Sequence, residues 1–574
     1  MRYTLRSGAL QVELEEQSHS ITIRDASRGD RLLIAPHLQL FSPVLEGKQP
    51  PMELQSVSCT EQAMVLRFAG DGVRSFELAI EAREGHLELY SRFVPVRRTE
   101  LNRLLLFPLG TGINMYDLVN FRNRHHTPQT WPELNCGEGF ATSTYSNDWQ
   151  FAPHPTMVIL RKNERSLFFG AKDMPTSYGM YIEAKDFVTA DWSLNYGPLG
   201  AGQLLEAGQP FESPRFCLFL EERKPVHEVI GAYTSLLVRE GHIPDPSLKK
   251  REAWHTENVY CTWHDQGYKS EVFIPTQLQE QTVSGTLDTA ASFMDERLVR
   301  EALDVIEREK LPFRTILLDT GWQTVTGDWR PHPERFPDFR KLVDEIHSRG
   351  MKAVVWWNWA ELYDQVVVEE RFLMDGGKRN KHGSRLRDYS NPQVRAEYLE
   401  PLFYKLFSSD PGSYDLDGVK TDFLADKVHA DIRLAEPAWR GEENYFYRVF
   451  ESFYTLMKRY KPDACHIGCS GHPYLSAFID INRTYDIFSS NVLEHKGRGE
   501  MLRSTTPGCP VAFDFHCYAE HLPDYFNLAA EHGFSVQIGN ILGMKRDFFS
   551  DWEPADTAYY DMLRDGLHKL AGGN

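Results

Sequence analysis

The sequence predicts a multidomain protein of the β and α/β classes, with an N-terminal β-sandwich followed by a catalytic (β/α)8 TIM barrel. Two observations lead to this prediction. Residues 1–222 hold many short segments in which polar and apolar residues alternate between turn signals. From residue 255 the pattern changes to a strand followed by a helix, and it repeats eight times before residue 574. That repetition is typical of a barrel of parallel strands covered by helices.

The N-terminal segments have the two-residue period of half-buried strands. Met64–Phe68 and Phe76–Ile80 alternate in this way, and Gly70-Asp71-Gly72 between them signals a turn. Many short strands at this spacing favour a sandwich of two sheets. Aromatic and polar residues gather at 140–149, where we expect either local packing or a loop that reaches over the active site of its own or a neighbouring subunit.

A helical linker is expected between the two parts. Apolar residues recur at helical spacing from His227 to Arg239, and Ile243-Pro244-Asp245-Pro246 then ends the pattern. The expected division is therefore a β-sandwich at 1–222, a linker at 223–254 and the barrel at 255–574.

The barrel region provides eight candidate strands, whose carboxyl ends should meet at one rim. These strands are Val259–Trp263, Thr315–Asp319, Lys352–Trp357, Gly418–Asp422, Cys465–Cys469, Tyr485–Ser489, Val511–Phe515 and Ser535–Gly539. The helices with the clearest apolar periodicity are Asp295–Lys310, Phe336–Arg349, Pro392–Phe407, Glu443–Tyr460, Tyr525–His532 and Ala555–Leu570.

The fourth strand ends in a carboxylate, Asp422, which is costly to bury and contributes little to packing. Lys420 lies two residues earlier, so it points to the same face, and its charge would help to keep Asp422 ionised. Asp422 and Asp486 form the pair of carboxylates that suits glycoside cleavage, one attacking the anomeric carbon and the other protonating the leaving oxygen. The alternatives are a structural ion pair between Lys420 and Asp422, and a pairing of Asp486 with Arg483.

The other strand ends carry aromatic, acidic and basic side chains of the kind that binds sugars. Aromatic faces stack on the C–H faces of a pyranose, and charged groups bond to its hydroxyls. The candidate substrate-binding residues are Trp263, Asp319, Thr320, Trp322, Trp357, Lys420, Cys469 and Arg483. The expected partner is therefore an oligosaccharide or another glycoside, and a homo-oligomer stays open.

Composition excludes several other classes. A net charge of −18 argues against nucleic acid, because phosphate contacts need a surplus of Lys and Arg. No apolar run reaches the roughly 18 residues of a membrane span, and the first residues lack the apolar core of a signal peptide. The eight cysteines are scattered without CxxC spacing, as expected for reduced thiols, so we expect a cytoplasmic protein.

No metal-ligand spacing and no glycine-rich phosphate loop stands out, so no metal and no cofactor is expected. The basic run Lys378–Arg387 is interpreted as a solvated loop, with contact to an anionic group of the substrate as the alternative.

Several motifs of the barrel belong together. They are Tyr260–Trp263, Leu317–Gln323, Arg335–Pro337, Gly350–Trp357, Asp388–Arg395, Asp417–Asp422 and Arg483–Ile487. In this order they resemble glycoside hydrolase family 36 and its relatives in clan D, which include α-galactosidases, α-N-acetylgalactosaminidases and the plant raffinose synthases. An N-terminal β-sandwich ahead of the barrel also fits that family.

The resemblance implies a retaining α-glycosidase and a role for each matching residue. Asp422 would be the nucleophile and Asp486 the acid/base. Asp319 and Lys420 would bind ring hydroxyls, Trp357 and Cys469 would line the glycone pocket, and Arg483 would lie near the 2-hydroxyl and the acid/base.

The sequence also departs from the family pattern. Thr320 stands where galactose-acting relatives have a second acid, and Gly471-His472-Pro473-Tyr474 replaces the family run after the fifth strand. The C-terminal β domain common in the family is not evident. The expected glycone is therefore not necessarily plain galactose. The other hypotheses are a transglycosylase of the raffinose-synthase type, a carbohydrate-binding protein without catalysis, and an aldolase or isomerase in which Lys420 forms a Schiff base.

Overall fold

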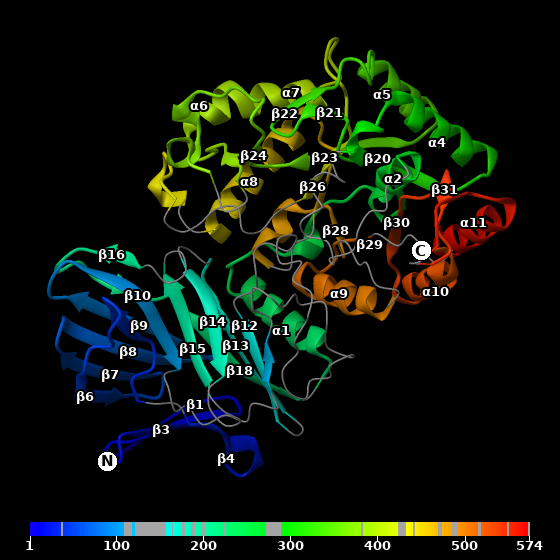
Figure 1. Cartoon of the computed structure of the whole chain (residues 1–574). Coiled ribbons are helices and arrows are strands. Elements are labelled where there is room, and N and C mark those ends of the chain that lie inside the picture. The colour runs from blue at the N-terminus through cyan, green and yellow to red at the C-terminus, as the bar shows by residue number, and fades with distance from the viewer. Residues whose placement is uncertain are drawn as a thin grey trace.

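The computed structural model describes the chain in two connected parts, a β-rich N-terminal part and a closed barrel (Figure 1). It describes residues 1–571 except for 36–37, 108–117, 121–156, 163–164, 175–177, 185–189, 197–201, 223, 271–288, 380–382, 423–431, 440–441, 469–472, 485–491, 515–517 and 548–549. The aromatic segment at 140–149 lies outside the described residues.

The N-terminal part consists of antiparallel sheets. Its strands are β1 (Arg2–Ser7), β2 (Leu10–Glu15), β3 (Ser20–Asp25), β4 (Arg31–Ile34), β5 (Ser42–Leu45), β6 (Met52–Cys59), β7 (Ala63–Gly70), β8 (Val73–Arg83), β9 (His86–Pro95), β10 (Thr99–Phe107), β11 (Leu118–Asn120), β12 (Met157–Lys162), β13 (Arg165–Ala171), β14 (Tyr178–Ala184), β15 (Ala190–Tyr196), β16 (Gln203–Leu205), β17 (Phe211–Glu212) and β18 (Phe216–Glu222). The largest sheet runs β11-β12-β13-β18-β9-β8-β7-β6, and a second runs β14-β15-β10-β16.

Alternation explains this part of the fold. Along β7 the buried residues Met64, Leu66 and Phe68 are every second residue, so one face of the strand is apolar. Buried side chains from β1, β2, β8, β9, β10 and β15 join them in one apolar core. The tight β8–β9 hairpin turns through Gly85, whose φ of 79° lies in the region that glycine adopts most readily.

Helix α1 (Val226–Arg239) connects the β-rich part to the barrel and is more than a linker. Its Tyr233 ring stacks on Phe168 of β13, with 4.8 Å between ring centroids. Its buried residues belong to the same apolar cluster as the barrel helices, and it packs beside α9 (Figure 1). The apolar core of the barrel part extends through this helix. The expected division at 222 and 254 stays a prediction.

Eight parallel strands close the barrel, as the sequence predicts. They are β19 (Asn258–Cys261), β20 (Phe313–Leu318), β23 (Lys352–Asn358), β26 (Gly418–Asp422), β27 (Cys465–Gly468), β28 (Ile481–Arg483), β29 (Val511–Phe513) and β30 (Ser535–Ile538). The surrounding helices are α2 (Trp263–Lys269), α4 (Glu296–Arg308), α5 (Phe339–Ser348), α6 (Pro392–Val394), α7 (Glu400–Phe407), α8 (Glu442–Tyr460), α9 (Val492–Thr505), α10 (Leu522–His532) and α11 (Thr557–Ala571).

Within the described residues, three two-stranded sheets lie outside the barrel strands. They are β21 (Gln323–Val325) with β22 (Asp328–Pro331), β24 (Glu361–Leu362) with β25 (Arg385–Leu386), and β31 (Gly543–Met544) with β32 (Glu553–Pro554). The first two follow β20 and β23, so they extend the rim on which those strands end.

Local sequence accounts for the better helices. Asp295 caps α4 by accepting a hydrogen bond from the backbone N–H of Leu298 at 2.8 Å, and Asp338 caps α5 in the same way. The buried residues Leu298, Ala302 and Ile306 of α4 recur every four residues and face the strands.

The sixth strand corrects the sequence prediction. The structure places it at Ile481–Arg483, four residues before the expected Tyr485–Ser489, which lies outside the described residues. Helix α9 was not expected either. Gly497 and Gly499 lie within it and weaken its apolar periodicity, but a Cβ on Gly499 would meet the Phe534 ring at 2.6 Å. That glycine therefore permits close packing that the sequence pattern does not reveal.

A buried carboxylate, Asp480, holds several segments together at the amino-terminal end of the barrel. Asp480, immediately before β28, accepts hydrogen bonds from the Tyr454 hydroxyl at 2.8 Å and from the backbone N–H of His466 at 3.0 Å. It also pairs with Lys249 at 3.0 Å and Lys458 at 3.2 Å. Burial disfavours its charged form, but the two ammonium groups prevail and lower the pKa of Asp480 to about 2. Residues at this end of a barrel usually stabilise the fold, whereas the chemistry takes place at the opposite end.

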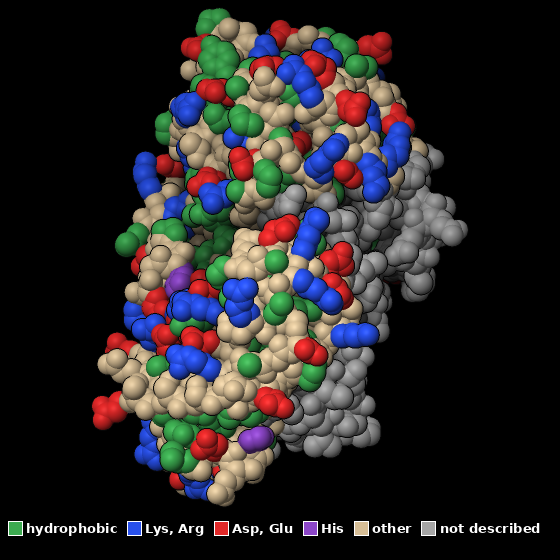
Figure 2. All heavy atoms as spheres, turned by 90° about the vertical axis from the view of Figure 1, so that its left-hand side faces the viewer, with side chains coloured by type: hydrophobic (Ala, Val, Ile, Leu, Met, Phe, Trp, Pro, Cys, Tyr) green, Lys and Arg blue, Asp and Glu red, His purple; other side chains and the backbone are tan. Residues whose placement is uncertain are grey.

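Charges of both signs are mixed on one face of the protein. Acidic and basic side chains alternate over the face drawn in Figure 2, without a patch of one sign. Among the described helices, none combines the length and the apolar character needed to cross a membrane. Five described cysteines, Cys59, Cys217, Cys261, Cys465 and Cys509, are free thiols.

Candidate active site

A chain of polar contacts crosses the inside of the barrel at the carboxyl ends of its strands. It runs through Cys261, Asp319, Lys420, Asp422, Arg483, Asp514 and Gln537, which belong to or directly follow β19, β20, β26, β28, β29 and β30. Apolar side chains of β19, β20, β23, β27, β28 and β29 form a cluster inside the barrel. The contacts bring together residues up to 276 positions apart in sequence on the rim where barrel enzymes hold their active sites.

Asp422 lies at the centre of this chain. One carboxylate oxygen accepts a hydrogen bond from the Arg483 guanidinium at 2.8 Å, and the other accepts one from the indole N–H of Trp356 at 3.1 Å. The Lys420 ammonium is 3.8 Å away. Two cations and an N–H donor around one buried carboxylate favour its ionised form, which is the form that attacks as a nucleophile.

Lys420 pairs more closely with Asp319 than with Asp422. Its ammonium lies 2.9 Å from the Asp319 carboxylate. Burial acts against the charge, but attraction to Asp319 outweighs it, so the pKa of Lys420 is raised above its ordinary value. A Schiff-base lysine needs the opposite shift, because only the neutral amine attacks a carbonyl. This geometry disfavours the aldolase or isomerase hypothesis.

Arg483 is fully buried and bridges two carboxylates. It donates to Asp422 through one nitrogen and to Asp514 through another, and the Gln537 amide donates to the second oxygen of Asp514. A guanidinium stays protonated and presents its donors in a rigid fork, so this arrangement fixes the orientation of Asp422. The sequence prediction placed Arg483 at the site, whereas Gln537 was missed because nothing near it in sequence signals a function.

Asp319 and Thr320 are held by their own neighbours. Asp319 accepts hydrogen bonds from the Thr320 backbone N–H at 2.8 Å and from the Cys261 thiol at 3.3 Å. Burial, followed by the charge of Asp319, raises the pKa of Cys261 well above its ordinary value, so the thiol keeps its proton and donates. The Thr320 hydroxyl accepts from the Gln323 amide at 3.3 Å. A hydroxyl therefore stands where the expected second acid would be.

The tryptophans of the site differ from expectation. Trp357 points out of the barrel and packs edge-on against Phe403 and Phe453 of the surrounding helices. Its neighbour Trp356 faces the inside and contacts Asp422. Trp322 is fully buried, and its indole N–H donates to the Trp356 backbone carbonyl at 2.9 Å. The alternation of side chains along a strand could have distinguished Trp356 from Trp357, because Trp356 is in register with Lys420, which faces the inside.

The remaining predicted residues fall into two groups. Trp263, at the start of α2, is half-buried and packs against the apolar residues inside the barrel. Asp486 and Cys469 lie outside the described residues.

The basic run Lys378–Arg387 is largely engaged within the protein. Arg379 pairs with Asp364 at 2.7 Å, and Arg385 donates to the Val366 carbonyl at 2.8 Å. Arg387 is buried, with its guanidinium 3.5 Å from the centre of the Tyr398 ring. These contacts support a structural role for the three arginines rather than contact with an anionic substrate group.

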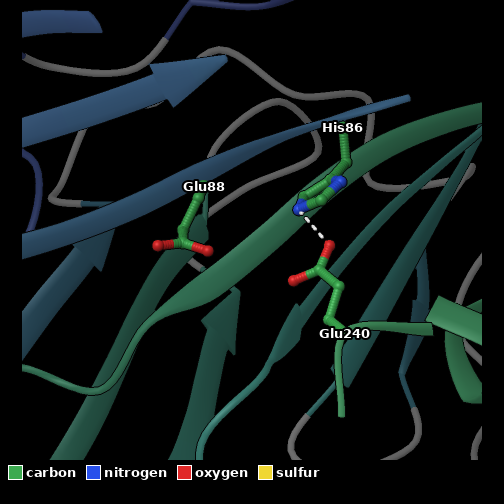
Figure 3. A group of neighbouring side chains, drawn as sticks. All are labelled: His86, Glu88 and Glu240. Atoms are coloured by element: carbon green, nitrogen blue, oxygen red, sulfur yellow. Dashed lines mark ion pairs between the residues drawn. The ribbon is translucent and has the colours of Figure 1, made fainter. Parts of the chain in front are cut away.

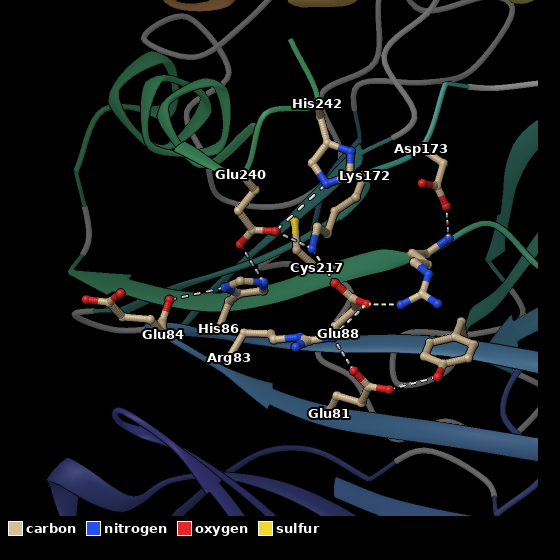
Figure 4. A network of polar contacts seen from close by, with 12 residues as sticks. Glu81, Arg83, Glu84, His86, Glu88, Lys172, Asp173, Cys217, Glu240 and His242 are labelled. Atoms are coloured by element: carbon tan, nitrogen blue, oxygen red, sulfur yellow. Dashed lines mark hydrogen bonds and ion pairs between the residues drawn. The ribbon is translucent and has the colours of Figure 1, made fainter. Parts of the chain in front are cut away.

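A second polar cluster lies outside the barrel. His86 and Glu88 of β9 and Glu240 at the end of α1 bring possible ligand atoms within 4.8 Å of one another, and Figure 3 shows His86 facing Glu240. The Lys172 ammonium contacts both Glu88 and Glu240 (Figure 4). Its charge takes the place that a metal cation would need. The cluster therefore joins the sheet to α1 through ion pairs.

Comparisons with known proteins agree on glycoside hydrolases. Residues 276–466 match the model of the glycosyl hydrolases family 31 TIM-barrel domain. A stretch of 76 residues is 41% identical to an A type blood α-D-galactosamine galactosaminidase of Flavonifractor plautii, and this stretch covers 12% of the chain and 7% of that protein.

Solved structures share the fold over the whole length. The chain resembles the GH36 α-galactosidase AgaB from Geobacillus stearothermophilus with a TM-score of 0.56 and 13% identity, covering 99% of this chain and 84% of that one. It also resembles a variant of α-galactosidase AgaA from the same organism in complex with stachyose, with a TM-score of 0.56 and 14% identity, covering 100% of this chain and 86% of that one. The barrel architecture is thus shared with glycoside hydrolases. The matching family model is that of family 31, and the similar solved structures are of family 36.

Proposed function

We propose that this protein is a retaining α-glycosidase of the α-galactosidase type, which removes terminal α-linked sugars from oligosaccharides or other glycosides. The observation that carries the proposal is the environment of Asp422. A buried carboxylate at the end of a barrel strand, oriented by Arg483 and Trp356, has the properties of a nucleophile. The likeness to glycoside hydrolases supports the reaction class.

The proposed reaction has two steps. Asp422 attacks the anomeric carbon while Asp486 donates a proton to the leaving oxygen, and a covalent glycosyl-enzyme forms. Asp486 then removes a proton from water, which attacks the same carbon and releases the sugar with net retention. Asp422 leaves as a carboxylate, and Arg483 and the Trp356 N–H stabilise the charge that returns to it.

The glycone is the part of the proposal that differs from a plain α-galactosidase. Asp319 and Lys420 form an ion pair at the end of β20 and β26, where they would bind ring hydroxyls. Thr320 offers a neutral hydroxyl in place of an acid beside them. We therefore expect a sugar related to galactose whose substituents tolerate this exchange, and an amino or N-acetylamino sugar is one candidate.

Aryl α- and β-glycosides of galactose, glucose, N-acetylgalactosamine and uronic acids test the reaction and the glycone together. We expect turnover of α-glycosides only, and nuclear magnetic resonance should detect the α-anomer of the sugar first. A β-anomer as the first product would contradict retention. Glycosyl transfer to an excess of acceptor sugar would instead favour the transglycosylase hypothesis.

Replacing the nucleophile gives the sharpest prediction. Asp422→Asn should lower kcat by about 10⁴-fold or more, because no other group can form the glycosyl ester. In Asp422→Ala, added azide should restore turnover of an activated aryl α-glycoside and yield a β-glycosyl azide. The matched control is Asp524→Asn, on an exposed position of α10. Near-normal activity of Asp422→Asn would refute the assignment.

A further inference from the structure

We propose that Asn358 is a substrate-binding residue, which accepts a hydrogen bond from one hydroxyl of the glycone, and that Glu361 is the residue that positions it. This inference deepens the proposed glycosidase function and rests on it. Neither residue is among the candidate site residues predicted from the sequence.

The first observation is the position of Asn358. It is the last residue of β23 and is paired in register with Asp422 of β26, as Trp356 is with Lys420. Trp356 reaches Asp422 with its indole N–H, so this face of β23 is the inside of the barrel. Side chains two residues apart on a strand share a face. Asn358 therefore stands next to the proposed nucleophile, one layer nearer to the rim.

The second observation fixes the orientation of the amide. The Asn358 amide nitrogen donates to a carboxylate oxygen of Glu361 at 2.6 Å. A carboxylate accepts hydrogen bonds but has none to give, so the nitrogen of the amide must face it. The amide oxygen is then directed away from Glu361, and the usual ambiguity between the two ends of an asparagine amide is removed.

The third observation concerns the amide oxygen. Asn358 is 3% exposed, and its oxygen has no donor among the described residues. Buried polar atoms of folded proteins almost always have a partner, so an acceptor of this kind needs an explanation. A hydroxyl of a bound sugar would supply the missing donor. The geometry points to a hydroxyl rather than to a substrate carboxylate, because a neutral acceptor beside Glu361 would repel an anion.

Such a site should discriminate strongly. A pocket with a buried acceptor rejects a ligand that lacks the matching hydroxyl, because the acceptor is then left without a partner and without water. The expected discrimination against the deoxy sugar is about 10- to 100-fold in affinity for one hydrogen bond of this type. It should concern one ring position and leave the other positions unaffected by Asn358.

Binding is best measured in a background without turnover. In full-length Asp422→Asn protein, calorimetry would give the affinity of each sugar that the aryl-glycoside panel contains, and of the 2-, 3-, 4- and 6-deoxy forms of the sugar that binds most tightly. The same set is measured on Asp422→Asn/Asn358→Leu. We expect one deoxy sugar to lose about 10- to 100-fold on the first protein and no more than about twofold on the second. Asn527→Leu, on an exposed position of α10, is the matched control.

Glu361 has its own arm of the test. Glu361→Gln keeps an acceptor opposite the Asn358 nitrogen, so the discrimination should persist. Glu361→Leu removes that acceptor and frees the amide to rotate, so the discrimination should fall even though Asn358 is unchanged. A residue that only supports the fold would affect all deoxy sugars alike.

Several outcomes would overturn the inference. It fails if both proteins discriminate equally at every ring position, if no deoxy sugar binds more weakly than its parent, or if no sugar of the set binds. Circular dichroism and the melting temperature of each variant establish that it is folded. Failure of the proposed function is a separate result, seen when wild-type protein binds these sugars with the expected discrimination but cleaves no glycoside.

Discussion

Trp356 and Trp357 are neighbours in sequence with opposite surroundings. Trp356 donates its indole N–H to Asp422 inside the barrel, whereas Trp357 packs against Phe403 and Phe453 outside it. The motif predicts Trp357 as the site residue, but a motif does not state which of two neighbouring residues points into the barrel. The pairing of β23 with β26 identifies the inward residue, because Trp356 is in register with Lys420. This register depends on the neighbouring strand as well as on β23.

This difference gives a paired prediction. Trp356→Phe removes a donor to a charged group, so kcat/KM should fall by about 10- to 100-fold with little change in the melting temperature. Trp357→Phe removes packing volume, so it should lower the free energy of unfolding by about 1–3 kcal/mol with kcat/KM within about twofold.

Steady-state kinetics and thermal unfolding of the two variants decide between these expectations. Trp359→Phe is a suitable control, because Trp359 is buried and packs against Tyr445 and Phe446 of α8. Equal kinetic losses for Trp356→Phe and Trp357→Phe would contradict the structure.

At the scale of elements, strand and helix periodicity was sufficient to predict the barrel. Seven expected strands overlap observed ones, since their apolar runs are buried on both faces. β28 was misplaced because Ile481–Arg483 is only three residues long and ends in a charged residue. Its Arg483 is buried through pairing with Asp422 and Asp514, and partners so distant in sequence cannot be read from a local pattern.

The buried ion pairs at the amino-terminal end of the barrel could not be predicted from the sequence, for the same reason. Asp480 joins Lys249, which precedes the barrel, to Tyr454 and Lys458 of α8. Nothing local distinguishes it from a surface aspartate. Its position directly before β28 only becomes meaningful once that strand is placed.

Asp480 leads to a prediction about pH. Its pKa is lowered to about 2, from an unfolded value near 3.9, so the unfolded state binds more protons between these values and stability falls as pH falls through them. Asp480→Asn should therefore lower the free energy of unfolding by about 2–3 kcal/mol at pH 6, and this loss should shrink below about pH 4.

Denaturant unfolding of both proteins from pH 7 to pH 3 measures this difference. Asp561→Asn, which removes an exposed partner of Arg564, should change stability by less than about 0.5 kcal/mol at every pH. A destabilisation by Asp480→Asn that did not depend on pH would show that lost packing, rather than lost charge, is responsible.

At the scale of the molecule, the β-rich part and the barrel meet through polar contacts as well as through α1. Lys172, directly after β13, contacts Glu88 of β9 and Glu240 at the end of α1. The Tyr474 hydroxyl of the barrel donates to the Lys172 backbone carbonyl. Burial lowers the pKa of His86, although Glu240 acts in the opposite direction, so His86 adds no cation at neutral pH.

Lys172 is therefore expected to be a stabilising residue of the whole chain. Lys172→Met leaves the buried Glu88 carboxylate with less compensation and should lower the free energy of unfolding by about 3–5 kcal/mol. Glu88→Gln in the Lys172→Met background should restore part of the loss, because one uncompensated charge is removed.

Thermal and denaturant unfolding of the single and double variants test this expectation. Lys224→Met, in an exposed pair with Glu221, serves as the control. If Lys172→Met unfolds like the control, the junction owes its stability to the apolar packing of α1 alone.

The bridge that Arg483 makes between Asp422 and Asp514 has a consequence for electrical balance. Among the described residues of the contact chain, the carboxylates of Asp319, Asp422 and Asp514 face the cations of Lys420 and Arg483, which leaves one negative charge in excess. A sugar ring that becomes positive as its leaving group departs brings this set to neutrality. A glycone that carries a carboxylate of its own would double the excess. The resting pocket should therefore exclude uronic acids by repulsion before any hydroxyl is recognised.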